Sequence, residues 1–265
     1  MCGIAGIFDL RQQREPDREL LAAMNQTQFH RGPDEGGLHT EPGVGLAHRR
    51  LSIIDLASGQ QPMFSADGNL CVSYNGEIYN FQELMQELRA LGYQFRTHCD
   101  TEVILYAWQA WGEACVQRFR GMFAFGLYDR AARSLFLARD RSGIKPLFYS
   151  VLPDGQLIFG SELKVLKAHP QLPRQLEPRA VEDYFALGYV PEPKTIYRDV
   201  YKLCPGHTML FRQGEPVPAQ QQYWDIPFAP VRVSSEADLQ AELLARLREA
   251  VQVRLVAEVP LGAFL

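Results

Sequence analysis

The sequence has little of what marks disulfide-rich, membrane-spanning and nucleic-acid-binding proteins. Its five cysteines (Cys2, Cys71, Cys99, Cys115 and Cys204) are odd in number and never spaced as C-x-x-C, which argues against a disulfide framework and against a zinc site. No uninterrupted apolar run approaches the ~20 residues that a membrane-spanning helix needs. The formal net charge of −4 comes without a cluster of Lys and Arg, which argues against a broad nucleic-acid-binding surface.

A targeting signal is also missing from the first residues, MCGIAGIFDL. No basic segment precedes the apolar run, and Asp9 and Arg11 end it after a few residues. Because the cysteines fit reduced thiols, we expect a cytoplasmic protein with no membrane partner and no nucleic-acid partner. We predict no metal site.

What is present is the composition of an ordinary globular protein. The 265 residues are 46% apolar and 22% charged, which allows one large or two modest domains with a substantial core. The residue pattern predicts strands at 3–8, 44–53, 122–129, 134–140, 146–152 and 156–162, the last four as one antiparallel meander, and helices at 80–92, 100–112 and 178–188. Two layers of sheet with helices packed outside would accommodate this mixture.

Local signals set the expected ends of several elements. Residues 70–74 and 77–80 are predicted to form the two arms of a hairpin, because the dipeptide Asn75-Gly76 suits a tight type I′ turn. The expected helix caps are Asn80 for the first helix and Asp100 or Thr101 for the second, with Gly92 and Gly112 as stops.

The composition shifts after residue 212. Residues 213–233 are rich in proline and lack a clear period, which predicts a linker. Residues 234–258 predict a long amphipathic helix with Ser234 or Ser235 as its N-cap, and 259–265 predict a buried strand. One helix and one strand do not make a domain, so we interpret 234–265 as the first piece of an α/β unit.

Cys2 directly follows the initiator methionine, which is commonly removed when the second residue is small. The chain would then begin with a thiol and a free α-amine on one residue. A thiol with a pKa of about 8.5 is mostly neutral at pH 7, and an α-amine with a pKa of about 7.7–8.0 can accept its proton. Cys2 is therefore a candidate N-terminal nucleophile. The alternatives are a cysteine paired with a histidine, and a small apolar residue that merely begins a strand.

Seven further motifs follow in order: HRGPDEGG (30–37), AHRRLSIIDL (47–56), NGEIYN (75–80), DTEVIL (100–105), GMFAFGLYD (121–129), RDRSGIKPLFY (139–149) and FGSELKVL (159–166). Together with MCGIAGIF they resemble the glutaminase half of glutamine-hydrolysing asparagine synthetases, a branch of the class II, N-terminal nucleophile glutamine amidotransferases. Details such as DYFALGYVPEPKTIY resemble the amidotransferases of bacterial exopolysaccharide and exosortase gene clusters. Any one motif would be weak evidence, but the set is specific.

The resemblance implies an α+β fold, namely a four-layer αββα N-terminal nucleophile hydrolase sandwich followed by the first helix and strand of an α/β ATP-pyrophosphatase-type synthetase domain. It divides the chain into a glutaminase domain at 2–212, a linker at 213–233 and the start of a truncated asparagine synthetase domain at 234–265. In that family VPLGAFL precedes the S-G-G-x-D-S loop that binds the ATP pyrophosphate. Leu265 is therefore the one candidate ATP contact.

The resemblance also assigns the glutamine site. Cys2 is the nucleophile, and the Asn75 side-chain amide and the Gly76 backbone N–H make the oxyanion hole. Arg50, in preference to its neighbour Arg49, is expected to bind the substrate α-carboxylate with its planar guanidinium. The remaining glutamine-binding residues are Leu51, Ser52, Ile53 and Ile54, which would line the pocket, and Glu77 and Asp100, which would contact the α-ammonium.

The implied reaction is hydrolysis of L-glutamine through a cysteine thioester. The ammonia would pass to an ATP-dependent synthetase half that amidates aspartate to asparagine, forming AMP and diphosphate. No cofactor is expected in the glutaminase domain, whereas ATP and Mg²⁺ are expected in the full-length enzyme, and a homodimer is an option. The alternatives are amidation of another carboxylate such as an exopolysaccharide component, a nucleotide- or sugar-directed amidotransferase, and a non-catalytic domain that keeps the fold.

Overall fold

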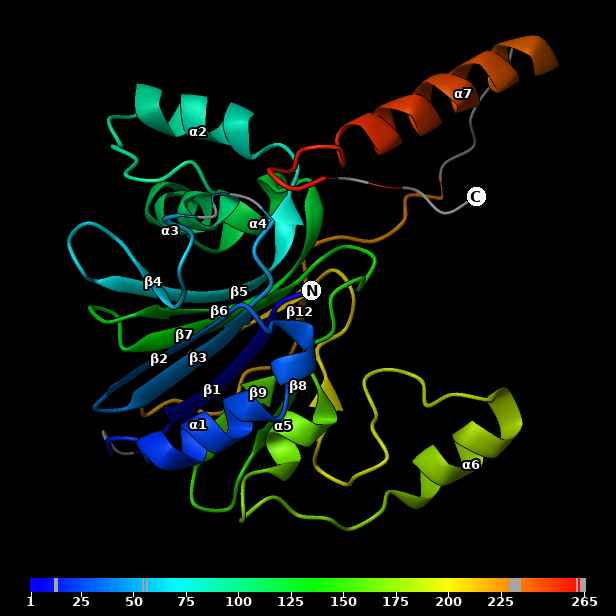
Figure 1. The fold of residues 1–265 in the computed structure, drawn as a ribbon. Coiled ribbons are helices and arrows are strands. Elements are labelled where there is room, and N and C mark those ends of the chain that lie inside the picture. Colours follow the sequence, from blue (N-terminus) through cyan, green and yellow to red (C-terminus); the bar gives the residue numbers. More distant parts are fainter. Residues whose placement is uncertain (12–13, 54, 56, 229–234, 261, 263–265) are drawn as a thin grey trace.

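The computed structural model describes residues 1–11, 14–53, 55, 57–228, 235–260 and 262. Two six-stranded antiparallel sheets stack face to face, and helices cover the outer face of each (Figure 1). The layers follow the order helix, sheet, sheet, helix, which confirms the predicted α+β sandwich.

The first sheet has the strand order β10-β8-β9-β1-β3-β2. Its strands are β1 (Gly3–Asp9), β2 (Glu35–Glu41), β3 (Val44–Arg50), β8 (Phe148–Val151), β9 (Gln156–Gly160) and β10 (Tyr201–Lys202). The N-terminal strand β1 lies inside the sheet, paired with β3 on one side and β9 on the other. All seven residues of β1 are buried, which explains why its sequence GIAGIFD is an apolar run rather than an alternation.

The second sheet has the order β12-β11-β7-β6-β5-β4. Its strands are β4 (Met63–Phe64), β5 (Leu70–Ile78), β6 (Gly121–Asp129), β7 (Ser134–Arg139), β11 (His207–Arg212) and β12 (Gln221–Gln222). β5 pairs with β6 along its whole length, but β4 covers its other edge only near Cys71 and Val72. The rest of that edge of β5 therefore has no neighbouring strand among the described residues.

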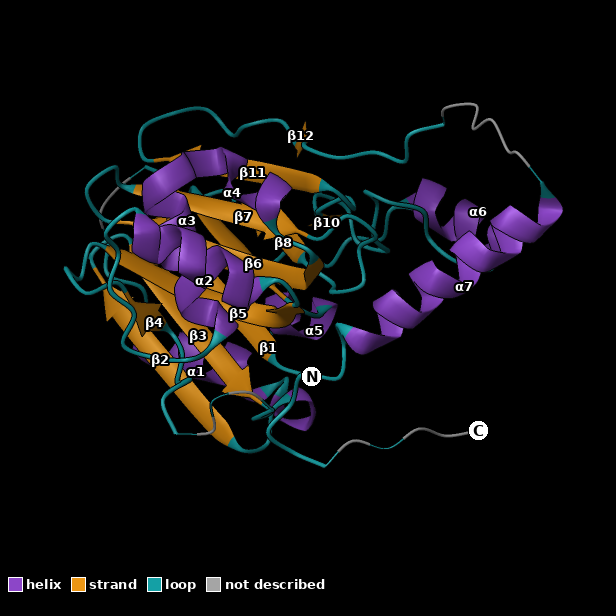
Figure 2. Ribbon diagram, turned by 90° about the horizontal axis from the view of Figure 1, so that it is seen from above, coloured by secondary structure: helices purple, strands orange, loops and turns teal. Residues whose placement is uncertain are grey.

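Helices form the two outer layers. The helices are α1 (Arg18–Gln26), α2 (Phe81–Ala90), α3 (Asp100–Trp111), α4 (Cys115–Arg118), α5 (Leu163–Lys167), α6 (Pro178–Leu187) and α7 (Glu236–Gln252), with 3₁₀ turns at Phe29–Arg31 and Gly112–Ala114. α1 and α5 cover the first sheet, whereas α2, α3 and α4 cover the second. α6 and α7 project from the body on one side (Figure 2).

The core between the two sheets is filled by alternate residues of the facing strands. Ile4 and Phe8 of β1 point into it, whereas Ala5 and Ile7 point to the helices on the outer face. The Phe159 ring from β9 occupies space that two glycines leave open, Gly6 beside it and Gly126 on the opposite sheet. This alternation fixes which face each site residue presents.

The predicted hairpin at Asn75-Gly76 is wrong. β5 runs straight through both residues, with Asn75 opposite Ala124 and Gly76 opposite Phe123. Neither residue has the positive φ that a type I′ turn requires. Gly76 is needed for another reason, because a Cβ there would lie 2.3 Å from the Met122 carbonyl oxygen.

The predicted single meander at 122–162 is also wrong, although its four strands exist. β6 and β7 belong to the second sheet, and β8 and β9 belong to the first. The chain crosses between the sheets at residues 140–147, which carry the RDRSGIKPLFY motif. A strand count from sequence cannot show such a crossing, because the two sheets have the same pattern of apolar residues.

The predicted helix stops are confirmed. Gly92 and Gly112 follow α2 and α3 with φ of +98° and +56°, where glycine is favoured over other residues. Asn80 occupies the predicted N-cap position of α2, but its side chain binds the backbone of Arg118 and Arg120 rather than the first turn of the helix. The predicted cap of α3, Asp100 or Thr101, is wrong, because Cys99 is the N-cap and Asp100 is the first helical residue.

The C-terminal part contains the predicted amphipathic helix, as α7. Ser235 caps α7 by accepting a hydrogen bond from the Asp238 backbone N–H. The apolar residues at helical spacing are 46–59% exposed, namely Leu239, Leu243, Leu244, Leu247, Val251 and Leu255. The predicted strand at 259–265 falls mostly outside the described residues. In the part of the chain that is described, no helix is long and apolar enough to cross a membrane.

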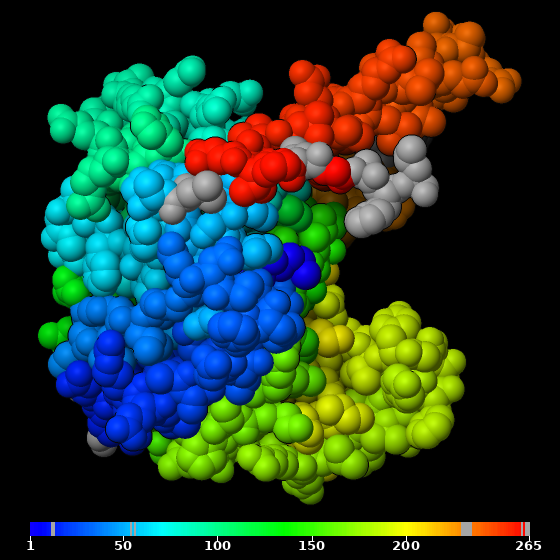
Figure 3. All heavy atoms as spheres, viewed as in Figure 1, coloured from blue at the N-terminus to red at the C-terminus, as the bar shows by residue number. Residues whose placement is uncertain are grey.

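The segment after α7 returns to the body of the protein (Figure 3). The Glu258 backbone N–H donates to the Ile53 carbonyl at 3.0 Å. The Arg254 guanidinium lies 4.7 Å from the centre of the Tyr79 ring. The segment thus lies beside the loop that follows β3.

Packing of Phe159 against Gly126 leads to a stability prediction. A Cβ at residue 126 would lie 2.7 Å from the Phe159 ring, so Gly126→Ala is expected to lower the free energy of unfolding by about 1–3 kcal/mol. Phe159→Leu shortens the facing side chain. The double variant is therefore expected to lose less than the sum of the single variants, by at least about 0.5 kcal/mol. Urea unfolding followed by tryptophan fluorescence measures all three; strictly additive losses would show that the two residues do not share this space.

Candidate active site

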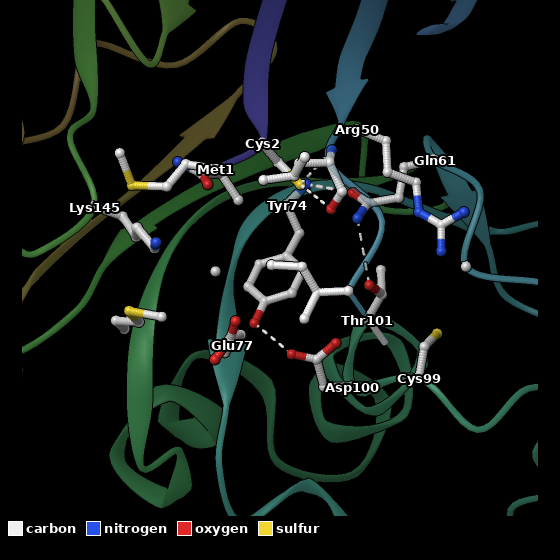
Figure 4. A pocket seen from close by; sticks show the side chains of 16 residues that line it. Met1, Cys2, Arg50, Gln61, Tyr74, Glu77, Cys99, Asp100, Thr101 and Lys145 are labelled. Atoms are coloured by element: carbon white, nitrogen blue, oxygen red, sulfur yellow. Dashed lines mark hydrogen bonds between the residues drawn. The ribbon is translucent and has the colours of Figure 1, made fainter. Parts of the chain in front are cut away.

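A cavity opens where β1 begins and where β3 and β5 end, next to the first turn of α3 (Figure 4). Its lining brings together predicted residues from four separate parts of the sequence: Cys2, Arg50, Leu51, Ile53, Asn75, Gly76, Glu77 and Asp100. Ser52 is not part of the lining, and its backbone N–H donates to the Asp34 carboxylate at 2.8 Å. Ile54 and Leu265 lie outside the described residues.

The Cys2 thiol is held by the backbone of Leu51. Sγ donates to the Leu51 carbonyl at 3.7 Å and accepts from the Leu51 N–H at 3.5 Å. Burial raises the pKa of this thiol, and the hydrogen bond from Leu51 opposes that rise. The thiol therefore needs a nearby base or cation to become a nucleophile.

The α-amine next to this thiol belongs to Met1 in the chain as translated. The nitrogen of Cys2 is then a peptide amide, which is not a base. Burial lowers the pKa of the Met1 α-ammonium. Met1 is 58% exposed, so the residue is open to removal, and removal would place a free amine on Cys2 itself.

Asn75 and Gly76 offer hydrogen-bond donors to the cavity. Both polar atoms of the Asn75 side chain are buried and have no hydrogen-bond partner among the residues that the structure describes. A buried amide without a partner costs free energy, so its persistence indicates a group kept free for a ligand. That ligand would be one that accepts a hydrogen bond.

The Gly76 N–H points to the uncovered edge of β5. The backbone N–H and carbonyl of Phe123, opposite Gly76, are both engaged by Asp140, so Gly76 and Phe123 form a non-hydrogen-bonded pair. The residues two positions away on β5 point their N–H groups to this same edge: the Tyr74 N–H donates to Gln61 Oε1, and the Ile78 N–H donates to Asp100 Oδ2. The Gly76 N–H lies between these two.

Two carboxylates face the cavity from below the thiol in Figure 4. Asp100 Oδ2 accepts from the Tyr74 hydroxyl at 2.7 Å and from the Ile78 N–H at 2.9 Å. Burial raises the pKa of Asp100 and of Glu77, and the Asp100 charge raises the pKa of Glu77 further. Asp100 is thus a buried residue at the start of α3 rather than an exposed cap. A pair of carboxylates in this setting favours a cationic ligand.

Arg50 lies on the opposite side of the cavity from Met1 (Figure 4). Its guanidinium donates to the Asp55 carbonyl at 2.6 Å and to the Glu35 carboxylate at 3.1 Å. Arg49, the residue before Arg50 in β3, points the other way, with its guanidinium 4.5 Å from the centre of the Phe29 ring. Successive side chains of a strand point to opposite faces of the sheet, so of these two arginines only Arg50 lines the cavity.

Sequence reasoning missed several polar residues of the lining, among them Gln61 and Lys145. Gln61 bridges β5 and α3, accepting from the Tyr74 N–H and donating to the Thr101 hydroxyl at 3.4 Å. Lys145 reaches the cavity from the crossing segment between the sheets. A lysine placed between Ile144 and the apolar PLF run was the available signal for it. Gln61 carried no comparable signal.

The assembled groups are a thiol, two free hydrogen-bond donors, two carboxylates and a guanidinium around one cavity. This arrangement can hold an amino acid by both its charged groups and present a carbonyl to the thiol. Within the described ranges, no cluster of three His, Cys, Asp or Glu side chains is arranged to hold a metal ion.

The buried Asp100 leads to a prediction about stability and pH. Folding raises the pKa of this carboxyl, so its ionised form opposes folding above that pKa, and the cost disappears as the pH falls toward the unfolded-state value of about 3.9. Asp100→Asn keeps an oxygen that can accept from Tyr74 and Ile78. We expect Asp100→Asn to raise the free energy of unfolding at pH 7 by about 1.4 kcal/mol for each unit by which folding raises the Asp100 pKa. Near pH 4 we expect no gain.

Urea unfolding between pH 4 and pH 8 measures this difference. Asp67→Asn is the matched control, because hydrogen bonds from Ser65 and Asn69 lower the pKa of Asp67 and its ionised form stabilises the fold. The control variant should lose stability at pH 7. A loss in both variants would contradict the cost assigned to Asp100.

Comparison with known proteins identifies relatives of this chain. Asparagine synthetase [glutamine-hydrolyzing] 1 of Bacillus subtilis is 38% identical over 267 residues, which is 100% of this chain and 42% of that protein. Asparagine synthetase [glutamine-hydrolyzing] 3 of the same species is 35% identical, over 100% of this chain and 43% of that protein. The chain thus spans less than half the length of these curated relatives.

A solved structure agrees on the fold. Glutamine phosphoribosylpyrophosphate amidotransferase from B. subtilis superposes with a TM-score of 0.57 at 17% identity, over 84% of this chain and 49% of that one. The sequence model of the glutamine amidotransferase domain family matches residues 1–224. With Cys2 in the cavity and the four-layer sandwich around it, the chain belongs to the glutamine amidotransferase domain family, of the class II, N-terminal nucleophile type.

Proposed function

We propose that this chain hydrolyses L-glutamine to glutamate and ammonia with Cys2 as its nucleophile. The observation that carries the proposal is the single cavity in which the thiol meets the unpartnered Asn75 amide, the Gly76 N–H and the two carboxylates. A non-catalytic domain would have no reason to keep a buried amide free. Membership of the glutamine amidotransferase family is the second argument for the proposal.

Glutamine would bind by its two charged ends. Its α-carboxylate would lie on Arg50, whose planar guanidinium suits a bidentate contact. Its α-ammonium would lie between Glu77 and Asp100, where it would offset the cost of two buried negative charges. The side-chain amide would then extend toward Sγ. Leu51 and Ile53 would shape the wall beside it.

The reaction would proceed in two halves. The Cys2 α-amine accepts the thiol proton, Sγ attacks the amide carbon, and the oxyanion is bound by Asn75 Nδ2 and the Gly76 N–H. Collapse breaks the C–N bond, and the amine returns the proton to the leaving nitrogen, which departs as ammonia. Water then attacks the thioester by the same route, releasing glutamate and restoring the thiol.

We further propose that the ammonia serves an ATP-dependent amidation of aspartate in the longer protein. Support comes from the relatives, which are named asparagine synthetases and are more than twice as long as the matched part. The exposed apolar residues of α7, and Phe185 of α6 at 84% exposure, are faces that a further domain would bury. ATP, Mg²⁺ and aspartate would bind there, and no step of glutamine hydrolysis needs them.

The first functional prediction concerns the N-terminus. Protein that begins at Cys2 is expected to release glutamate from glutamine, whereas protein that keeps Met1 or carries an N-terminal tag is expected to be inactive, because its Cys2 nitrogen is an amide. Intact-mass spectrometry establishes the N-terminus, and a coupled glutamate assay measures activity. Cys2→Ala should abolish activity.

Cys204→Ala is the matched control for that experiment, since Cys204 is a half-buried thiol outside the cavity. It should retain wild-type activity. Full activity in a tagged protein would refute the role of the α-amine, and activity in Cys2→Ala would refute the nucleophile.

The second functional prediction concerns Arg50. Arg50→Lys keeps the charge but loses the planar pair of donors, so KM for glutamine is expected to rise at least about tenfold, a loss of ~1.4 kcal/mol, with a smaller change in kcat. Arg49→Lys is the control and should change neither constant, because Arg49 faces away from the cavity. Equal losses in kcat and KM for Arg50→Lys would place the guanidinium in the chemical step instead.

A further inference from the structure

Lys145 is a buried cation that the proposed reaction does not use. It is 4% exposed and lines the cavity together with Cys2 and Glu77. Figure 4 shows its side chain on the Met1 side of the cavity, opposite Arg50. It makes no ion pair or hydrogen bond through its ammonium with another described residue. A lysine is rarely buried without such a partner, so its place needs a reason.

The backbone of Lys145 is held at both ends. Its N–H donates to Asp140 Oδ2 at 2.9 Å, and its carbonyl accepts from Arg139 Nε at 2.8 Å. The fully buried Asp140 carboxylate also accepts backbone N–H groups from Phe123, Ser142 and Ile144. These hydrogen bonds fix the backbone of the crossing segment, residues 140–147, and so hold Lys145 at the cavity.

Resting on the proposed glutaminase function, we propose that Lys145 is a positioning residue for the nucleophile: its ammonium, fixed beside the thiol and the N-terminal amine, favours the ionised thiol and the neutral amine. The chemistry needs both states at once. The amine must be free to take the thiol proton, and the sulfur must carry negative charge when it attacks. One buried cation near both groups favours both.

The electrostatics agree with this geometry. Burial raises the pKa of the Cys2 thiol and lowers that of the Met1 α-ammonium, and the nearby Lys145 charge acts to lower both. Burial lowers the pKa of Lys145 itself, and the charges of Glu77, Cys2 and Asp140 raise it again. The titratable and charged groups around this centre are Cys2 and the α-amine from β1, Arg31 and Asp34 from the segment after α1, Glu77 from β5, Asp100 from α3 and Asp140 from the crossing segment.

The test follows the thiol directly and needs no glutamine. Processed protein is treated with iodoacetamide between pH 5 and pH 10, and the rate of alkylation of the Cys2 peptide is measured by mass spectrometry. Lys145→Met removes the charge at similar length and is expected to shift the midpoint upward by about one pH unit or more. Lys145→Arg keeps the charge and is expected to restore the wild-type midpoint.

Two further variants make the test specific. Glu77→Gln removes the negative charge that partly neutralises Lys145, so the Cys2 midpoint is expected to move downward, opposite to Lys145→Met. Lys202→Met is the control, because Lys202 is a half-buried lysine that binds the Val190 carbonyl outside the cavity. It should leave the midpoint unchanged. Circular dichroism confirms the fold of each variant.

The outcomes separate this inference from the proposed function. An upward shift in Lys145→Met with rescue by Lys145→Arg supports the inference, whether or not the wild type hydrolyses glutamine. An unchanged midpoint in folded Lys145→Met overturns it, even if glutaminase activity is present or lost. If Lys145→Met does not fold, Lys145→Gln, which also removes the charge but keeps a polar end group, takes its place, and an unchanged midpoint there overturns the inference.

Discussion

The site depends on one uncovered strand edge. β4 is two residues long, so the edge of β5 from Tyr74 to Ile78 has no strand beside it in the described part of the chain. Its backbone N–H groups need other acceptors, and the side chains of Gln61 and Asp100 supply two of them. The N–H between them is left to a ligand. A longer β4 would pair this edge and remove the donor.

The same edge explains why costly charges persist here. Asp100 binds the Ile78 N–H and so holds the backbone of β5, and it also faces the cavity with a pKa raised by burial. One carboxylate thus holds the backbone of β5 and also faces the cavity. Under the proposed function, the carboxylates on one side of the cavity and the Arg50 guanidinium on another would set the orientation of the bound amino acid.

Much of the fold could be predicted from the sequence, because its signals are local. The apolar run of β1 and the glycines that end α2 and α3 each identify an element without knowledge of the rest. The assignment of β6 to β9 to two sheets could not be predicted, because it depends on the crossing between sheets, which pattern and turn length do not encode. The predicted turn at Asn75-Gly76 was wrong, because the same dipeptide also fits a strand edge at which a small residue is needed.

For the site, the motifs indicated Cys2, Arg50 and Asp100, but not what each side chain touches. Gln61 was missed because an isolated glutamine has no distinguishing neighbours in sequence. The resemblance favoured Arg50 over Arg49, but the physical reason, which is the direction in which each side chain leaves β3, follows only once the register with β1 is known. Contacts between distant segments are the information that a single sequence does not contain.

The exposed Met1 has a consequence for how such a chain is switched on. Under the proposed mechanism, a chain that keeps Met1 is inactive, and removal of this exposed residue activates it. Folding alone would assemble the cavity, and a single proteolytic cut would supply its base. Activity in a cell would then follow the capacity of N-terminal processing as well as the amount of protein made.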